Sequence, residues 1–178
     1  MRYFTQLDNA TGTGYRECFS SAAAMVAAFY KKVQTDDEYN TIRIKYGDTT
    51  SVDAQIQTLE SLGLNAKFIK NADRDIIEME IEMGRPVIVG WLDKGPIDHP
   101  TCNSASCGHY SVISGYRGKN SQDPEWIMQD PRGLPDMKNG GHSNPHLGRN
   151  VRVRQAEFDA RWQREGRNTG WAVLVDDD

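Results

Sequence analysis

The chain has 178 residues, of which 38% are hydrophobic and 26% charged, and its formal net charge is −4. This length suits one domain with a sizeable core, and the acidic balance argues against a nucleic-acid-binding protein, which normally carries a basic excess. No apolar run approaches the length of a membrane span, and the N-terminus lacks the charged-then-apolar pattern of a signal peptide. We therefore expect a single domain over residues 1–178, monomeric and without membrane insertion, and leave its cellular location open.

The N-terminal part of the chain predicts a buried helix that begins with a cysteine. Residues 1–16 suit a short extended segment and a polar loop, and residues 18–32 follow with a run of small and apolar side chains. A helix that is apolar on every side is expected in the middle of the fold. At its first turn, free backbone N–H groups and the helix dipole would stabilise a thiolate of Cys18. Cys18 is thus a candidate nucleophile, and a small inert core residue is the alternative.

The rest of the first half is predicted to be mainly helical. Thr35 opens a capping-box pattern, and glycines stand where the helices should end. Apolar residues recur at helical spacing between these signals, whereas residues 64–69 alternate like a strand. We expect helices over residues 36–46, 52–62 and 73–83, which end at Gly47, Gly63 and Gly84.

The second half changes to strand-length apolar runs separated by loops. A polar stretch over residues 131–150 has no apolar periodicity, and a loop of that length is usually functional. We expect strands over residues 86–91, 109–116, 125–130 and 170–175, a short helix over 155–164, and a further loop over 92–107. Helices in the first half and strands in the second predict an α+β fold, in which the central buried helix packs on a C-terminal antiparallel sheet.

The predicted strands bring two polar side chains together. His109 begins one strand and Asp130 ends the next, so in an antiparallel pair the two side chains are neighbours. A carboxylate can then orient the imidazole, which in turn can activate the Cys18 thiol. Gln6 offers an amide N–H₂ group that could stabilise an oxyanion together with the backbone N–H of Cys18.

These four residues, in this order, carry a resemblance to a known family. Gln6, Cys18 in CFSSAAAMVAAFY, His109 in GHYSVISGY and Asp130 in IMQDP resemble the peptidase-like family related to the domains that cleave double-glycine leaders from bacteriocins. The resemblance covers about residues 5–175, and it departs from the family pattern where Phe19 and Ser20 replace the usual Gly-Pro.

The resemblance implies a papain-like fold and a thiol-dependent hydrolase without a metal or another cofactor. Its catalytic residues would be Cys18, His109 and Asp130, with Gln6 as oxyanion donor. The substrate would be a peptide, a protein or peptidoglycan, and a freestanding domain of this size suits a bacterial or phage enzyme. Transpeptidation, which uses the same acyl-enzyme, stays open beside hydrolysis.

Several other side chains are placed with less support from the pattern. Trp91 and Gly108 flank the predicted cleft and are candidates for substrate binding. We expect His142 and His146 to be exposed in the polar loop. The remaining tryptophans near strands and helices are predicted to be core residues: Trp126, Trp162 and Trp171.

Two competing interpretations remain. The first is a tetrahedral zinc site made from His99, Cys102, Cys107 and His109, whose ligand types fit although their spacing is not that of a standard zinc motif. If there is no such site, Cys102 and Cys107 form a disulfide or stay as inert thiols. The second interpretation is a non-catalytic interaction domain on the same fold, against which the presence of all four site residues argues.

Overall fold

The computed structural model describes residues 1–101 and 108–177 of the chain. Its helices are η1 (Gln6–Asp8), η2 (Gly14–Arg16), α1 (Cys18–Phe29), α2 (Asp36–Arg43), α3 (Val52–Ser61), α4 (Arg74–Glu82) and α5 (Gln155–Trp162), of which η1 and η2 are short 3₁₀ turns. Its strands are β1 (Asn65–Ala72), β2 (Val87–Trp91), β3 (His109–Arg117), β4 (Glu125–Gln129), β5 (Leu134–Pro135), β6 (His142–Asn144), β7 (Val151–Arg154) and β8 (Gly170–Asp176).

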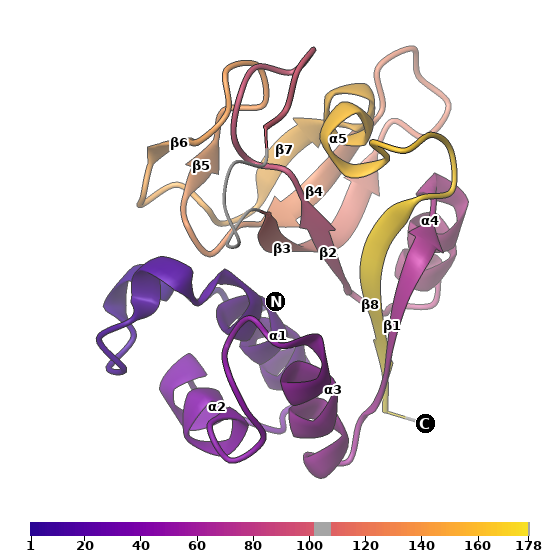
Figure 1. Cartoon of the computed structure of the whole chain (residues 1–178). Coiled ribbons are helices and arrows are strands. Elements are labelled where there is room, and N and C mark those ends of the chain that lie inside the picture. Colours follow the sequence, from indigo (N-terminus) through magenta and orange to yellow (C-terminus); the bar gives the residue numbers. More distant parts are fainter. Residues whose placement is uncertain (102–107, 178) are drawn as a thin grey trace.

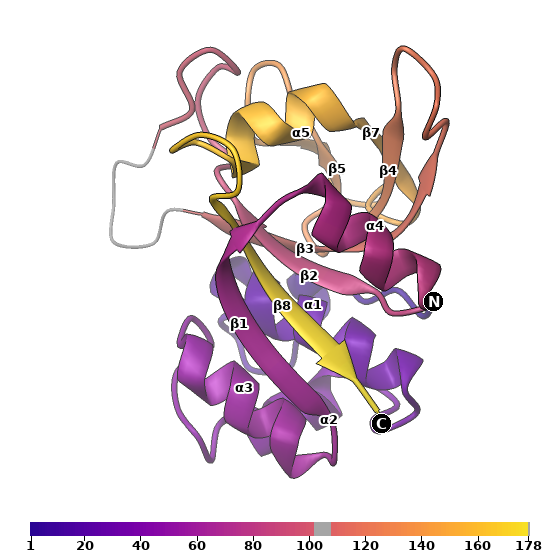
Figure 2. The ribbon, with the colours of Figure 1, turned by 90° about the vertical axis from the view of Figure 1, so that its right-hand side faces the viewer.

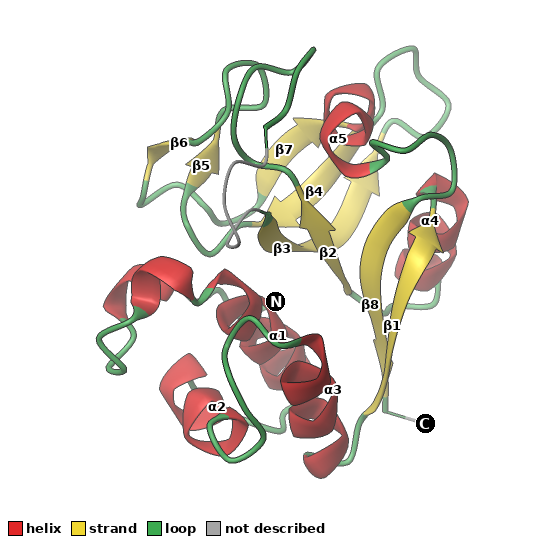
Figure 3. Ribbon diagram, in the orientation of Figure 1, coloured by secondary structure: helices red, strands yellow, loops and turns green. Residues whose placement is uncertain are grey.

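A six-stranded sheet with the order β1-β8-β2-β3-β4-β7 forms the centre of the molecule (Figure 1). Every neighbouring pair in it is antiparallel. Helices α1, α2 and α3 lie on one side of the sheet, and α4 and α5 lie on the other (Figure 2). The structure confirms the predicted α+β class, with helices α1–α3 preceding all of the strands named above (Figure 3).

The alanine-rich helix α1 is as buried as its composition predicts. Its residues 22–27 are all fully inaccessible to solvent, and they pack against Ile88, Val112 and Val173 of the sheet. The helix ends at Phe29 rather than at residue 32, because Lys31 has a left-handed backbone (φ 62°) that cannot continue an α-helix. Burial on all sides fixes the axis of α1, and with it the position of the cysteine at its first turn.

Side chains of β2 alternate between two hydrophobic cores, one on each face of the sheet. Ile88 faces α1, whereas Val87 and Val89 face the opposite side, where they join Ile77 of α4 and Phe158 of α5. This is the period-2 pattern of a strand that is buried on both faces. Strands β2 and β3 are therefore held from both sides, which makes their ends rigid supports for a site.

Besides the end of α1, the largest differences from the sequence prediction are two element boundaries and one region. Helix α2 ends at Arg43 instead of residue 46, and β1 extends to Ala72 instead of residue 69. The interval 131–150, predicted to be a loop, contains the β5–β6 hairpin, and the strand β7 that follows it was not predicted. Strand β7 has four residues and pairs with β4 at the sheet edge, so its stability comes from this long-range pairing.

Among the helices of residues 1–101 and 108–177, none combines the length and the apolar character needed to cross a bilayer. The predicted disulfide or zinc ligands Cys102 and Cys107 lie outside the described residues.

Candidate active site

Cys18 is the first residue of α1, and its side chain is partly exposed. The residue before it, Glu17, is fully buried and lies 3.7 Å from the Arg43 guanidinium of α2. Three side chains of the preceding loop donate hydrogen bonds to the Glu17 carboxylate: Asn9 (2.6 Å), Thr11 (2.8 Å) and Thr13 (3.0 Å). The loop is therefore wrapped around a buried carboxylate, which holds the N-terminus of the helix and the thiol in place. No local pattern in the sequence marks this anchor.

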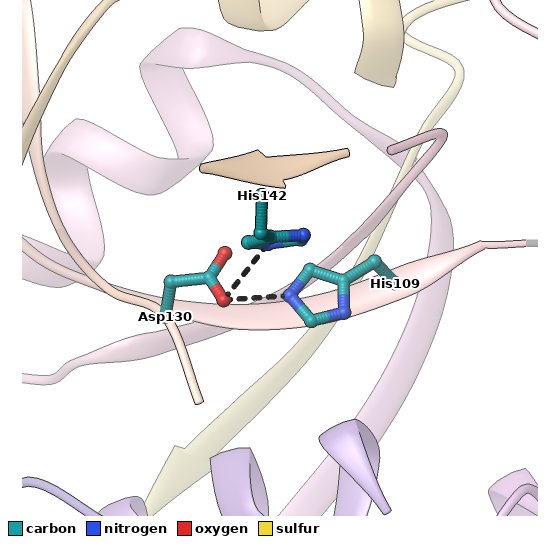
Figure 4. A group of neighbouring side chains, drawn as sticks. All are labelled: His109, Asp130 and His142. Atoms are coloured by element: carbon teal, nitrogen blue, oxygen red, sulfur yellow. Dashed lines mark hydrogen bonds and ion pairs between the residues drawn. The ribbon is translucent and has the colours of Figure 1, made fainter. Parts of the chain in front are cut away.

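His109 and Asp130 meet as the strand pattern predicts. Strands β3 and β4 are antiparallel neighbours, with Val112 opposite Gln129. The start of β3 therefore lies beside the end of β4, and Nε2 of His109 is 2.8 Å from Oδ1 of Asp130 (Figure 4). Both side chains are almost completely buried, at 2% and 0% exposure.

The Cys18 thiol also acts on the imidazole: after Asp130, it contributes to raising the pKa of His109. Nε2 is taken by Asp130, so Nδ1 is the ring nitrogen left for the thiol. Tyr110, the residue after His109, stacks on Phe19 of α1 with ring centroids 3.7 Å apart, so β3 and the first turn of α1 are in direct contact. A thiol, an imidazole and a carboxylate connected in this order are the parts of an activated cysteine nucleophile.

The electrostatic interaction between His109 and Asp130 favours the charged form of both side chains. Burial alone would lower the pKa of His109, but the charge and hydrogen bond of Asp130, together with Cys18, raise this pKa well above its usual value. Burial alone would raise the pKa of Asp130, but His109 and His142 hold the pKa of that carboxyl below its usual range. The geometry therefore stabilises an imidazolium facing the thiol and a carboxylate behind it.

Asp130 is held by more than the imidazole. Its Oδ2 accepts a hydrogen bond from Ser111 Oγ (2.9 Å), which in turn accepts one from Trp91 Nε1 (3.1 Å). Its Oδ1 accepts from the Arg132 backbone N–H (2.9 Å). The role of Ser111 was not predicted, although the strand period could have suggested it: Ser111 is two residues after His109 and therefore points to the same face of β3.

Gln6 is buried and connects the two sides of the site. Its backbone N–H donates to the Pro131 carbonyl (2.9 Å), directly after Asp130, and its side-chain Nε2 donates to the Gly14 carbonyl (2.8 Å), four residues before Cys18. Gly14 must lack a side chain here, because a Cβ would collide with the Gln6 carbonyl oxygen. One N–H of the Gln6 amide remains without an assigned acceptor, and Oε1 has no hydrogen-bond partner among the described residues.

Trp91 and Gly108 line a cavity of about 310 Å³ together with His109 and Tyr110. Trp91 itself is only 3% exposed, and its ring lies edge to face against His109, with the ring centroids 5.4 Å apart. Trp91 is therefore buried beneath the cavity and offers little surface to a ligand. Trp171, expected in the core, is 45% exposed and lines the same cavity. The prediction for Trp171 was wrong because its position in β8 faces outward, whereas Trp126 and Trp162 are buried as expected.

The prediction that His142 is exposed was also wrong. Its side chain is only 5% exposed, and its Nε2 lies 3.2 Å from Oδ1 of Asp130, next to the ring of His109, whose centroid is 4.7 Å away (Figure 4). The hairpin of β5 and β6 brings it there, and the Gly141 N–H donates to the carbonyl of Asp93, two residues after β2. His146, in contrast, is exposed as predicted.

The family model of the Peptidase_C39 like family matches residues 1–168 of the chain. None of the curated proteins compared with the chain matches it.

Several solved structures are similar over nearly the whole chain. The peptidase domain of Streptococcus ComA, a bifunctional ABC transporter of a quorum-sensing pathway, is 21% identical with a TM-score of 0.59; the match covers 98% of this chain and 97% of that one. A double-glycine-motif protease from an AMS/PCAT transporter, solved with its leader peptide, is 20% identical with a TM-score of 0.56, over 98% and 89% of the two chains. A Bacillus anthracis protein described as a C39-like peptidase is 12% identical with a TM-score of 0.62, over 98% and 94%. These likenesses show the fold, which is the papain-like α+β fold expected from the sequence.

Proposed function

The chain belongs to the Peptidase_C39 like family, and from this premise we propose that it is a cysteine peptidase whose nucleophile is Cys18. One observation carries the proposal: His109 is hydrogen-bonded to the buried carboxylate of Asp130, and the first turn of α1, which begins at Cys18, packs directly on the start of β3, which begins at His109. Family membership alone would be compatible with a domain that has lost its activity, whereas this connected arrangement is the one that thiol catalysis needs.

In the proposed reaction the Cys18 thiolate attacks the carbonyl carbon of a peptide or isopeptide bond. The C–S bond forms, and the carbonyl oxygen becomes an oxyanion. When the tetrahedral intermediate collapses, the C–N bond breaks and the imidazolium of His109 gives its proton to the leaving amine. The neutral imidazole then takes a proton from water, the hydroxide attacks the thioester carbonyl, and the C–S bond breaks, which releases the acid and restores the Cys18 thiolate beside the imidazolium. Asp130 orients the ring throughout and stabilises its charged form.

The oxyanion would be stabilised by two donors that approach it from different segments. One is the backbone N–H of Cys18 at the start of α1, where the helix dipole adds its positive end. The second is the free N–H of the Gln6 amide, whose other N–H is engaged with Gly14. A preorganised donor of this kind is worth roughly 3–4 kcal/mol in the transition state.

We propose a peptide as the substrate class. One of the similar solved structures is a protease in complex with a leader peptide, and the cavity beside His109 could accept an apolar side chain next to the scissile bond. The aromatic rings of Tyr110, Trp162 and Trp171 in its lining support that preference.

Alkylation tests whether Cys18 is a reactive thiolate, and this experiment does not require a known substrate. An ordinary cysteine has a pKa of about 8.5 and is less than roughly 1% thiolate at about pH 6, so it reacts slowly with iodoacetamide there. We expect Cys18 to be carbamidomethylated before Cys102 and Cys107 under these conditions, after all three have been reduced. Peptide mapping by mass spectrometry gives the order of labelling.

The variant His109→Ala serves as the matched comparison for this labelling. Loss of the imidazolium should slow alkylation of Cys18 by at least about tenfold at about pH 6 while leaving the two loop cysteines unchanged. Equal labelling of the three cysteines, or no effect of the His109 substitution, would count against the proposed thiolate–imidazolium pair.

Replacing Gln6 by alanine should lower kcat by about 10²–10³-fold and change KM much less, because the lost donor acts on charge that exists only in the transition state. The matched variant Gln6→Glu keeps the length of the side chain but lacks both N–H donors, so it should be at least as slow. Steady-state kinetics on a cleaved peptide measure both constants. An increase of KM with unchanged kcat would assign Gln6 to ground-state binding instead.

A further inference from the structure

His142 is a buried imidazole that the proposed reaction does not use. Its side chain is 5% exposed, and within the described residues neither of its buried ring nitrogens has an aligned hydrogen-bond partner. Nε2 lies 3.2 Å from Oδ1 of Asp130, and Nδ1 lies 3.9 Å from Oδ2 of Asp93. Buried polar groups without a partner are rare in folded proteins, and a bound ion is one way in which such a group is satisfied.

Three metal-binding atoms converge at this point. Oδ1 of Asp130 is 2.8 Å from Nε2 of His109 and 3.2 Å from Nε2 of His142, and the three residues offer ligand atoms that all lie within 4.8 Å of one another (Figure 4). A four-coordinate zinc ion with bonds of about 2.0–2.2 Å keeps its ligands about 3.3 Å apart. The 3.2 Å separation is already close to that value, the 2.8 Å separation is shorter, and the two imidazole nitrogens lie within 4.8 Å of each other.

The surroundings also suit a bound cation. Metal-bound histidines commonly direct their second nitrogen at a carboxylate, which fixes the ring. Nδ1 of His142 faces the carboxylate of Asp93, which is 3% exposed. The backbone carbonyl of Asp93 also accepts a hydrogen bond from the N–H of Gly141, the residue before His142. Ser111 holds the second oxygen of Asp130 at 2.9 Å. The two carboxylates, Asp93 and Asp130, match the charge of a divalent cation, although Arg132 also lies 3.8 Å from Asp93.

We propose that His109, Asp130 and His142 form a binding site for a divalent transition-metal cation of the Zn²⁺ type. Two imidazoles and one carboxylate are ligands that favour such ions over Ca²⁺ or Mg²⁺. This site differs from the zinc site considered from the sequence, with which it shares only His109.

Binding at this site has a consequence that rests on the proposed function. A metal bond to Nε2 of His109 requires that the proton on this nitrogen leaves to solvent, and the cation then replaces that proton between His109 and Asp130. While Nε2 is bonded to the metal, only Nδ1 can carry a proton, so the imidazolium can no longer form. A cation bound at this site would therefore inhibit the peptidase reversibly.

The first experiment measures binding in a Cys18→Ser variant, which removes the thiol as a ligand and makes the result independent of turnover. We expect about one equivalent of Zn²⁺ by calorimetry and, with Co²⁺ as a spectroscopic probe, the visible absorption of a low-coordinate site. His142→Ala should weaken binding by at least about 100-fold, because a direct ligand is lost. His146→Ala is the matched control: it is an exposed histidine four residues away, and its substitution should leave the affinity unchanged.

Ligand identity can also be read without a substitution at His142. In the Co²⁺-loaded Cys18→Ser protein, two histidines should give paramagnetically shifted imidazole signals, which covers the case in which His142→Ala does not fold. Absence of binding, equal affinity in the folded His142→Ala variant, or binding lost only on replacing Cys102 and Cys107 would overturn the proposal. Metal binding without any peptidase activity in the unmodified protein would uphold the site and reject the proposed function separately.

Discussion

Replacing Cys18 by alanine is expected to abolish peptide cleavage, with a loss of roughly 10⁵-fold or more in kcat. The proposed mechanism forms a bond to this sulfur, and within the described residues no other cysteine is available to take its place. The remaining rate would come only from binding and from the oxyanion donors, because the nucleophile is missing. The measurement is cleavage of a peptide library followed by mass spectrometry, together with intact-mass detection of the acyl-enzyme.

The structure suggests that this substitution leaves the fold intact. Cys18 is partly exposed at the first turn of α1, and Glu17 anchors the turn through a separate set of hydrogen bonds. The thermal midpoint of Cys18→Ala should therefore lie close to that of the unmodified protein. A Cys102→Ser, Cys107→Ser double variant is the matched control and should keep its turnover. Cleavage by Cys18→Ala within about tenfold of the normal rate would reject Cys18 as the nucleophile.

The parts of the fold that the sequence predicts well are those with a strong local signal. The run of alanines in α1, the threonine cap of α2 and the glycines after α3 and α4 each act within a few residues, and these helices begin within one residue of where they were expected, although α1 and α2 end earlier. Strand β7 was missed because four alternating residues carry little signal by themselves. It exists because it pairs with β4, which is a contact between distant segments.

The candidate site divides in the same way. His109 and Asp130 could be brought together from sequence because antiparallel neighbours place the start of one strand beside the end of the next. His142 could not, since its burial depends on a two-stranded hairpin in a segment without apolar periodicity and on a backbone hydrogen bond to Asp93. The buried carboxylate of Glu17 likewise gives no local signal. In both cases tertiary contacts decide the burial of a polar residue that the local pattern would leave at the surface.

Asp130→Ala is expected to lower kcat/KM by about 10²–10³-fold and to reduce the free energy of unfolding by about 3 kcal/mol. The side chain is fully buried, and its removal leaves His109, Ser111 and the Arg132 N–H without their acceptor. Breaking a buried charged pair by removing one partner is strongly destabilising for this reason. Chemical denaturation measures the stability, and peptide cleavage in the presence of a chelator measures the rate without interference from bound metal.

The matched variant Asp130→Asn separates the two roles of the carboxylate. Its amide oxygen can still accept the Nε2 proton of His109, so the ring stays oriented, as in the Cys-His-Asn arrangement known from papain-like enzymes. The negative charge is lost, however, and this charge is a main reason why the pKa of His109 lies well above its usual value. Without it the pKa falls, the imidazolium is lost at a lower pH, and the alkaline limb of the kcat/KM profile should move to lower pH. An unshifted alkaline limb in Asp130→Asn would mean that Asp130 acts on His109 through orientation alone, whereas an acid-shifted limb with most of kcat retained would assign it the electrostatic role as well.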